Sequence, residues 1–429
     1  MARGLRAYGA ILADPRARAF SAAGLVARMP LSMTGLGIVL LVSITTGSFA
    51  RAGLITAVGT LVGAATAPWW GRLIDRWGQA RVLVLAGVTN AVSLSVLTTS
   101  VLAGWPLGVT VAAAVGVGLG FSSAGSAVRA RWAYRLGDSP LLNTAYALEA
   151  VLDEVVFIVG PVLVTLLATA LHPAVGLGTC VVLGLVGAVT LASMRSTAPP
   201  VLVGRSRIGH LGRIPVRRLA PLVVASTALG AVFGSMEVVV VAFAQAAGVL
   251  SSAGFILMAW AFGSLLAGVV IGTISWRVSA ARRFRVAAVL MAVSLLPLPF
   301  VHSPLLVALL LVLSGFAIAP TLIASVAVTQ SVVPRGRLTE ALGWNSTGLA
   351  AGLAGGAAGA GALIDASGPT AGFVGILGAG AALALTALFV RGPRTAPAPA
   401  TAAPGALSPD APGTPGAGRA RPAVRSPPR

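Results

Sequence analysis

Long apolar runs recur along the whole chain with short turns between them, and this pattern limits the possible folds more than any other feature. The sequence has 429 residues, of which 57% are hydrophobic and only 9% charged. Soluble domains carry about a quarter charged residues, so these few charges could not cover a water-exposed surface. A run of about 20 apolar residues is long enough to cross a bilayer as a helix. The runs are continuously apolar and not alternating, which argues against a β-barrel. The sequence therefore predicts an all-α, multi-pass membrane protein.

The spacing of these runs predicts the domain organisation. The predicted spans are 19–44, 52–70, 82–102, 107–127, 143–169, 174–194, 220–245, 253–275, 286–301, 305–328, 341–364 and 370–390. Glycine, proline and serine mark the turns between them. We expect an N-terminal six-helix bundle over 1–194, a basic cytoplasmic linker over 195–219 and a C-terminal six-helix bundle over 220–391. Residues 392–429 are rich in Pro, Ala and Gly without periodicity, which predicts a disordered cytoplasmic tail.

All 30 basic residues are arginine, and their positions predict the orientation in the membrane. Arg51 lies in a connection on one side of the predicted membrane, and Arg28 lies within the first span. The other arginines lie in the termini and connections on the opposite side. Because basic residues accumulate in cytoplasmic segments, both termini are predicted to be cytoplasmic, in the plasma or inner membrane. The net charge of +20 thus has a topological cause, and we expect no nucleic-acid partner.

The second connection reads GRLIDRWGQAR over residues 71–81. Together with the six-plus-six layout, it resembles the signature loop of the major facilitator superfamily. The matching positions are Gly71, Leu73, Asp75, Arg76 and Gly78, with Arg81 following the non-matching Gln79 and Ala80. The resemblance covers about residues 19–391 and implies twelve transmembrane helices in two pseudo-symmetric six-helix bundles. It also implies a substrate site between the bundles near the bilayer midplane.

In that family the loop helps to hold the cytoplasmic face closed, so the resemblance implies a conformational latch formed by Gly71, Asp75, Arg76, Gly78 and Arg81. The residue types suit the role, because glycines permit a tight turn and close approach, and Asp75 can face the positive end of a helix dipole. The alternative is a charged turn that only fixes topology. The corresponding stretch of the second half, 272–285, keeps Gly272 and its arginines but has no Asp, which implies a one-sided latch.

Two further stretches bear on the type of transporter that the resemblance implies. The fourth span lacks the arginine that proton-coupled members of the family often carry. The fifth span contains GPVLVT from Gly160, which resembles a fragment of the Gly-Pro motif of the family's antiporters. This fragment favours an efflux-like member, and the use of arginine in place of lysine throughout, with many Gly, Pro and Ala residues, favours a bacterial source.

The fifth span also carries three acids, Glu149, Asp153 and Glu154. A carboxylate at the centre of a bilayer costs about 2.5–3.5 kcal/mol on insertion scales. Arg28 lies about 13 Å into the first span, and Glu149 and Asp153 lie about 9 and 15 Å into the fifth. Arg28 can therefore pair with one or both of them, which leaves at least one carboxylate unpaired and able to carry a proton. The three acids are candidates for proton coupling. The alternatives are a static clip between the two helices and, for Arg28, a ligand for an anionic substrate.

Glu237, in the seventh span, has no basic residue in the spans of the second half to neutralise it. It is a candidate proton or cation site, and the alternative is a rim residue that reaches water. Asn345 in the eleventh span, Tyr146 and Trp344 are candidate cavity-lining residues, as is Trp260. Helix packing and interfacial aromatics are the alternatives.

The combined prediction is a secondary transporter that exports small hydrophobic molecules by alternating access, driven by a proton gradient. We expect no enzyme, metal or other cofactor, because the sequence has no GxxxxGK[ST] nucleotide loop and no catalytic or metal-ligand pattern. The expected partners are a small-molecule substrate, protons and the lipid bilayer, with the protein a monomer. One alternative is a proton-coupled uptake symporter for an anionic or polar metabolite. Another is a non-transporting membrane receptor or scaffold.

Overall fold

The computed structural model describes residues 8–392 except 122, 202–214, 274–277 and 335–336. Within these residues the elements are helical, and no strand is formed. The α-helices are α2 (Pro15–Arg28), α3 (Pro30–Thr46), α4 (Phe49–Trp77), α5 (Gln79–Leu102), α6 (Leu107–Leu119), α7 (Ala124–Leu136), α8 (Leu141–Ala170), α9 (Pro173–Ser193), α10 (Val216–Ala246), α11 (Ala253–Thr273), α12 (Ala280–Leu295), α13 (Pro304–Gly315), α14 (Ile318–Val332) and α15 (Leu338–Leu388). Short 3-10 helices are η1 (Arg195–Thr197), η2 (Leu250–Ser252) and η3 (Leu298–Phe300). The predicted tail, 392–429, lies outside the described residues except for Gly392, and so does most of the predicted linker.

Eleven helical segments of the described chain are long and apolar enough to cross a membrane. The last of them, Glu340–Leu388, contains two predicted spans, because the helix bends at Gly368. Gly368 has φ 80, a value that L-residues with side chains rarely adopt, and Pro369 follows it. The segments thus account for the twelve predicted spans, and the predicted all-α membrane fold class is confirmed.

Three predicted spans are broken in the structure. The first divides at Met29 into α2 and α3, because Pro30 has no N–H to continue the hydrogen-bond ladder. The fourth divides into α6 and α7, and the tenth into α13 and α14. The fourth also extends beyond its predicted end at residue 127, because α7 continues to Leu136. Each of these three spans is therefore made of two helical segments.

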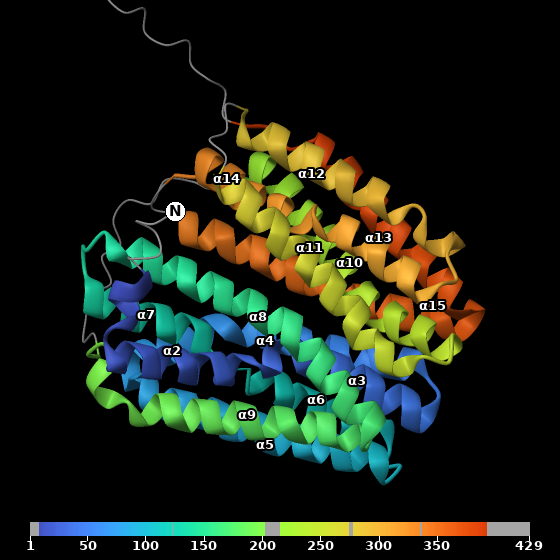
Figure 1. The fold of residues 1–429 in the computed structure, drawn as a ribbon, viewed down its shortest axis with the longest axis horizontal. Helices are drawn as coiled ribbons and strands as arrows, with labels where there is room; N and C mark the ends of the chain where they lie inside the picture. Colours follow the sequence, from blue (N-terminus) through green and yellow to red (C-terminus); the bar gives the residue numbers. More distant parts are fainter. Residues whose placement is uncertain (1–7, 122, 202–214, 274–277, 335–336, 393–429) are drawn as a thin grey trace, which may run out of the picture. The chain divides into compact units, whose positions relative to one another are not determined.

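The helices of the two halves of the chain lie side by side, the first half coloured blue to green and the second yellow to red (Figure 1). Contacts within each half predominate, and α4 with α15, α8 with α11 and α3 with α10 join the halves. We call one end of the helices the arginine-rich end; it includes Arg76, Arg135, Arg282 and Arg337. The turns at Gly47, Gly104, Gly248 and Gly368 form the opposite end.

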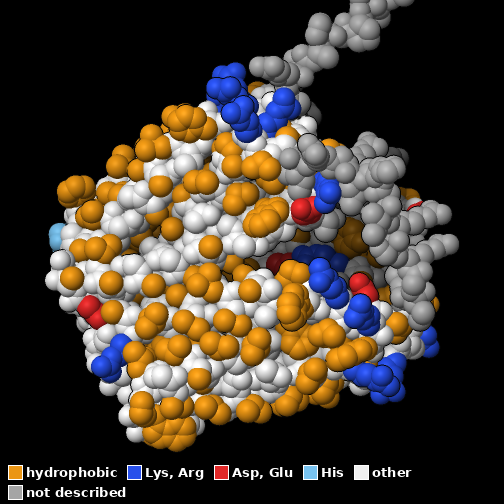
Figure 2. All heavy atoms as spheres, turned by 180° about the vertical axis from the view of Figure 1, so that it is seen from behind, with side chains coloured by type: hydrophobic (Ala, Val, Ile, Leu, Met, Phe, Trp, Pro, Cys, Tyr) orange, Lys and Arg blue, Asp and Glu red, His pale blue; other side chains and the backbone are white. Residues whose placement is uncertain are grey.

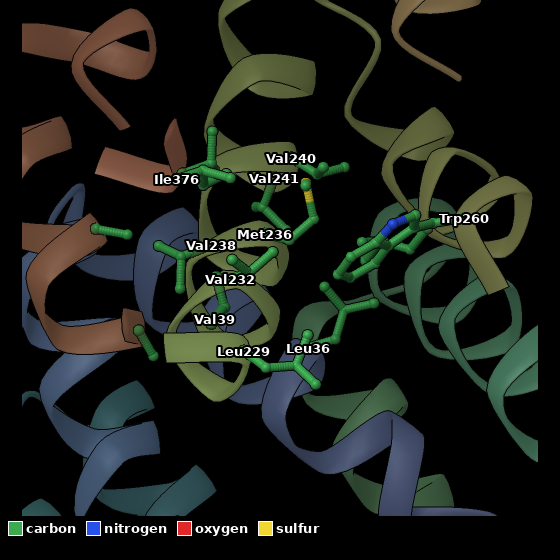
Figure 3. Packing of buried hydrophobic residues seen from close by; sticks show 14 of the residues in the cluster. Leu36, Val39, Leu229, Val232, Met236, Val238, Val240, Val241, Trp260 and Ile376 are labelled. Carbon is green, nitrogen blue, oxygen red and sulfur yellow. The ribbon is translucent and has the colours of Figure 1, made fainter. Parts of the chain in front are cut away.

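The hydrophobic core is continuous from one half to the other and is centred on α10. In the most apolar stretch of this helix, 78% of the residues are buried. Figure 3 shows its side chains packed with those of neighbouring helices, and the labelled examples include Leu36 and Val39 of α3, Val232 and Met236 of α10, and Trp260 of α11. Most side chains of α10 are therefore enclosed by other helices of the protein.

Glycines allow α10 and α15 to pack backbone against backbone. A Cβ at Gly352 would overlap the carbonyl oxygen of Thr227, and a Cβ at Gly234 would overlap that of Leu353. Small residues at such contacts let membrane helices gain close van der Waals packing. The glycine stripe of the eleventh predicted span thus serves helix packing, whereas Gly355 on the same helix faces open space.

We expect Gly352→Ala to destabilise the protein and Gly355→Ala to leave its stability almost unchanged. Overpacking a tight contact typically costs about 1–3 kcal/mol, and here a backbone oxygen would have to move. Thermal unfolding of the two variants in the same detergent measures the difference. Equal melting temperatures would show that the α10–α15 contact tolerates an added methyl group.

Candidate functional site

A buried ion pair joins α2 to α8. Arg28, the last residue of α2, is 5% exposed, and its guanidinium donates to Glu149 Oε2 at 2.5 Å and to Asp153 Oδ1 at 2.6 Å. Its Nε donates to the carbonyl oxygen of Gly24 at 3.0 Å, which fixes the direction of the side chain. Glu149 and Asp153 lie one turn apart on α8 and so present their carboxylates to the same neighbour.

Glu149 is fully buried and receives hydrogen bonds from three side chains. Besides Arg28, the Ser21 hydroxyl donates at 2.6 Å and the Trp132 indole N–H at 2.9 Å, both to Oε1. A buried charge is tolerated when it is paired and its remaining lone pairs are satisfied. The surroundings of Glu149 thus favour a static clip over a group that binds and releases a proton.

Asp153 has a second basic partner that the sequence analysis missed. Arg129 Nη2 donates to Asp153 Oδ2 at 2.5 Å, and Asp153 is 28% exposed. Arg28 and Arg129 thus pair both Glu149 and Asp153, so Glu154 is the acid of the three that has no ion-pair partner among the described residues. The predicted spans place Arg129 in a connection, but α7 continues the fourth span as a helix and carries Arg129 to α8. The only feature of the sequence that points to a continued helix here is the spacing of the arginines beyond residue 127.

Glu154 follows Asp153 but points away from this network, because successive residues of a helix lie about 100° apart. It is half-buried, and among the described residues it forms no ion pair or hydrogen bond. It therefore remains a candidate for proton coupling.

Glu237 lies on α10, where the two halves meet. A Cβ at Gly35 of α3 would lie 3.0 Å from Glu237 Oε2 and 3.7 Å from the Thr56 methyl group of α4. The missing side chain at Gly35 thus provides the space that the carboxylate occupies. Within the described part of the chain, no ion pair or hydrogen bond to Glu237 is formed. An ionised carboxylate in such a place would be uncompensated.

Several buried polar atoms also have no hydrogen-bond partner among the described residues. They are Thr56 Oγ1 of α4, Thr165 Oγ1 of α8, Trp260 Nε1 of α11 and Asn345 Oδ1 of α15. Buried polar groups are normally satisfied, so water or a bound molecule is expected at such atoms. They come from both halves of the chain. Asn345 is also tied to α14, because its amide donates to Thr329 Oγ1 at 2.7 Å.

The predicted latch residues lie at the end of α4, at the arginine-rich end. Gly78 ends the helix with φ 80, and its N–H donates to the Ile74 carbonyl oxygen. Asp75, Arg76 and Arg81 are exposed, and no ion pair or hydrogen bond to their side chains is formed among the described residues. A Cβ at Gly71 would meet nothing within 4 Å. Among the described residues, the predicted latch residues therefore form no ion pair or hydrogen bond that would hold this end closed.

Gln79, which departs from the signature, holds a buried arginine. Arg131 is fully buried and its Nε donates to Gln79 Oε1 at 2.8 Å. Its Nη atoms donate to the carbonyl oxygens of Leu191 and Met194 at the end of α9 and to the Thr197 hydroxyl of η1. The sequence analysis did not identify this contact, since carbonyl oxygens carry no sequence signal.

At the opposite end, Asp365 of α15 caps α4. Its carboxylate accepts from the Ser48 hydroxyl at 2.7 Å, the Phe49 N–H at 2.8 Å and the Ala50 N–H at 3.0 Å. Burial acts to raise the pKa of Asp365, but hydrogen bonds from Ala50, Ser48 and Phe49 outweigh it and hold the pKa below its usual value. Asp365 lies in the turn between two predicted spans and joins the two halves of the chain.

Open space is found nearer the arginine-rich end. Tyr146 of α8 and Trp344 of α15 lie within two turns of the start of their helices there, and both are exposed. Figure 2 shows a hollow in one face of the molecule where acidic and basic side chains gather. Among the described residues, no group of His, Cys, Asp and Glu could hold a metal ion.

Solved structures of membrane transporters share this fold. The structure of the nucleoside transporter NupG matches with a TM-score of 0.68 and 13% identity, covering 87% of this chain and 98% of that one. The POT family transporter PepTSo matches with a TM-score of 0.67 and 11% identity, covering 87% of this chain and 96% of that one. The human organic anion transporter MFSD10 matches with a TM-score of 0.60 and 16% identity, covering 88% and 100%. At these identities the likeness is one of fold.

No curated protein sequence matches the chain. The model of the Major Facilitator Superfamily matches residues 20–304 and 249–428, which together cover most of the sequence. The sequence signature in the second connection, the twelve spans and the fold agree with that match. The chain therefore belongs to the Major Facilitator Superfamily.

Proposed function

We propose that this transporter exports small, hydrophobic molecules in exchange for protons, by alternating access. The observation that carries the proposal is the position of Glu237. It is a carboxylate without a described partner, on the most enclosed helix, where α3 and α4 of one half meet α10 of the other. The proton-coupled step is assigned to this residue first and to Glu154 second.

The physical reason is that relative movement of the halves changes the surroundings of Glu237. In the present state Glu237 is half-buried with its carboxylate beside Gly35, and no described basic group compensates a charge there, so the neutral, protonated form is favoured. If α10 moves away from α3 and α4, water can reach the carboxylate and the proton can leave. A group that is alternately enclosed and hydrated links proton movement to the conformational cycle.

The state of the two ends indicates where substrate could exchange. Asp365 joins the halves at the opposite end, while the predicted latch residues at the arginine-rich end form no ion pair among the described residues. The arginine distribution assigns the arginine-rich end to the cytoplasm, so this state exchanges substrate with the cytoplasm, and the choice of export rests on the Gly-Pro fragment. The Gly-Pro fragment lies where the halves meet, because Gly254 of α11 packs against the Pro161 carbonyl oxygen.

A hydrophobic substrate fits the few polar groups that are left for recognition. Arg28, Glu149, Asp153 and Arg129 are engaged with one another. The unpartnered atoms of Thr56, Thr165, Trp260 and Asn345 belong to hydroxyl, indole and amide groups, which could orient a ligand but not neutralise a charged one.

Glu237→Gln is expected to abolish proton-driven transport while substrate exchange continues, because exchange needs no change in protonation. Transport and counterflow in proteoliposomes under an imposed pH gradient measure the two processes, using a panel of neutral lipophilic drugs. Glu340→Gln is the matched control, since Glu340 is exposed and paired with Arg337 one turn away. Proton-driven transport by Glu237→Gln equal to that of the parent would refute the assignment, and Glu154→Gln would then be tested in the same way.

Arg28→Gln is expected to unfold or strongly destabilise the protein, because Glu149 would keep a buried charge without its cation. Breaking a buried pair typically costs about 3–5 kcal/mol, and the double variant Arg28→Gln/Glu149→Gln should recover part of that loss. Thermal unfolding and membrane abundance measure both effects. If Arg28→Gln kept its stability and lost only substrate binding, Arg28 would instead be a ligand, and uptake of an anionic metabolite would be the better function.

Asp365→Asn is expected to weaken closure at the opposite end. The pKa of Asp365 is lowered in the closed state, so its negative charge stabilises closure. This stabilisation is fully present above the ordinary pKa of 3.8 and is lost as the pH falls through the lowered pKa. At neutral pH the variant should therefore show a larger open population than the parent. Electron–electron distances between spin labels at Trp105 and His302, in a Cys180→Ser background, measure that population.

The control for this experiment is Asp138→Asn, which removes the same charge from an exposed turn at the arginine-rich end. An unchanged distance distribution in Asp365→Asn would show that the cap does not contribute to closure.

A further inference from the structure

We infer that the outer surface of α12 near the arginine-rich end binds an anionic phospholipid of the surrounding bilayer. Two grooves run along this helix, one on each side, and both begin at Arg282. The assignment is independent of the transport function proposed above.

The larger groove has a volume of about 640 Å³ and lies between α12, the end of α11 and the pair α13–α14. Its apolar walls include Ile271, Val286, Leu290, Leu313, Phe316 and Ile323. The smaller groove, of about 390 Å³, lies on the side of α12 that faces Leu388. Val286 and Leu290 form a ridge that is common to both, so two acyl chains could lie on either side of it.

The grooves open to the bilayer and not to the hollow between the halves. The ridge residues Val286 and Leu290 are 51% and 57% exposed, and α12 packs only against α13, α14 and α15 of its own half among the stronger helix contacts. Surfaces of this kind are covered by lipid chains in a membrane. The larger groove extends from Arg282 to Ser294, about 18 Å of helix, which is close to the ~15 Å of one hydrocarbon leaflet.

The charge at the start of the grooves selects the head group. Arg282 and Arg283 line the larger groove, Arg282 and Arg285 line the smaller one, and neither lining contains an acid. The buried Nε of Arg285 has no hydrogen-bond partner among the described residues. Guanidinium groups bind phosphate oxygens through several N–H donors at once, and a cluster of arginines at the end of a membrane helix attracts anionic lipids. An apolar groove that leads from such a cluster fits a phospholipid better than a free anion.

The test is to add phosphatidylglycerol, phosphatidylcholine or inorganic phosphate to the full-length protein in a neutral detergent and to measure bound lipid by native mass spectrometry. We expect phosphatidylglycerol to bind more tightly than phosphatidylcholine and to resist displacement by phosphate. Arg282→Gln/Arg285→Gln should weaken phosphatidylglycerol binding by about ten-fold or more. Arg72→Gln/Arg76→Gln removes the same charge at the same end and is the control.

A second pair of variants tests the acyl-chain groove itself. Val286→Trp places a bulky side chain on the exposed ridge and should weaken binding of both phospholipids, whereas Val182→Trp, at a site 57% exposed on α9, should not. Equal binding of the two lipids, equal effects of the two arginine pairs, or displacement of phosphatidylglycerol by phosphate alone would each overturn the inference.

Discussion

The interior of a bilayer offers no hydrogen-bond partners, so every charged group within the spans must be compensated by another part of the chain. Arg28 and Glu149 illustrate the complete solution, in which a buried arginine and two donors from other helices surround one carboxylate. Glu237 illustrates the incomplete one, since it lies half-buried beside Gly35 and forms no ion pair or hydrogen bond among the described residues. The first arrangement holds two helices of the same half in a fixed relation. The second lies between halves, where a change in packing alters the solvation of the carboxylate.

The packing of the spans follows from the same lack of solvent. Apolar side chains gain little by leaving lipid, so close van der Waals contact and hydrogen bonds hold the helices together. Gly234 and Gly352 therefore set the distance between α10 and α15, while Asp365 uses the free N–H groups at the start of α4. Proline has the complementary effect at Pro30, where it ends the helix ladder and leaves Arg28 at the last turn of α2. Glycine and proline residues thus help to determine where the charged side chains lie.

The number of spans and the fold class could be predicted from the sequence, because a helix in a bilayer must satisfy its own backbone and so leaves a continuous apolar run. The depth of Arg28 relative to Glu149 could also be predicted, because it needs only the rise per residue. Arg129 was missed because the sequence does not show whether an arginine beyond an apolar run lies in a loop or in a helix that brings it to an acid. Asp365 was missed because its partners are mostly backbone N–H groups, which every residue but proline possesses.

Arg131 has a consequence for the chain that connects the halves. Its guanidinium bonds the last carbonyl groups of α9 and Thr197 of η1 to Gln79, the first residue of α5. The chain at the end of the first half is therefore fastened to α5 as far as Thr197. Gln79 follows Gly78 directly and lies four residues after Asp75, so a displacement of the backbone at Thr197 would reach the signature loop through a single guanidinium group.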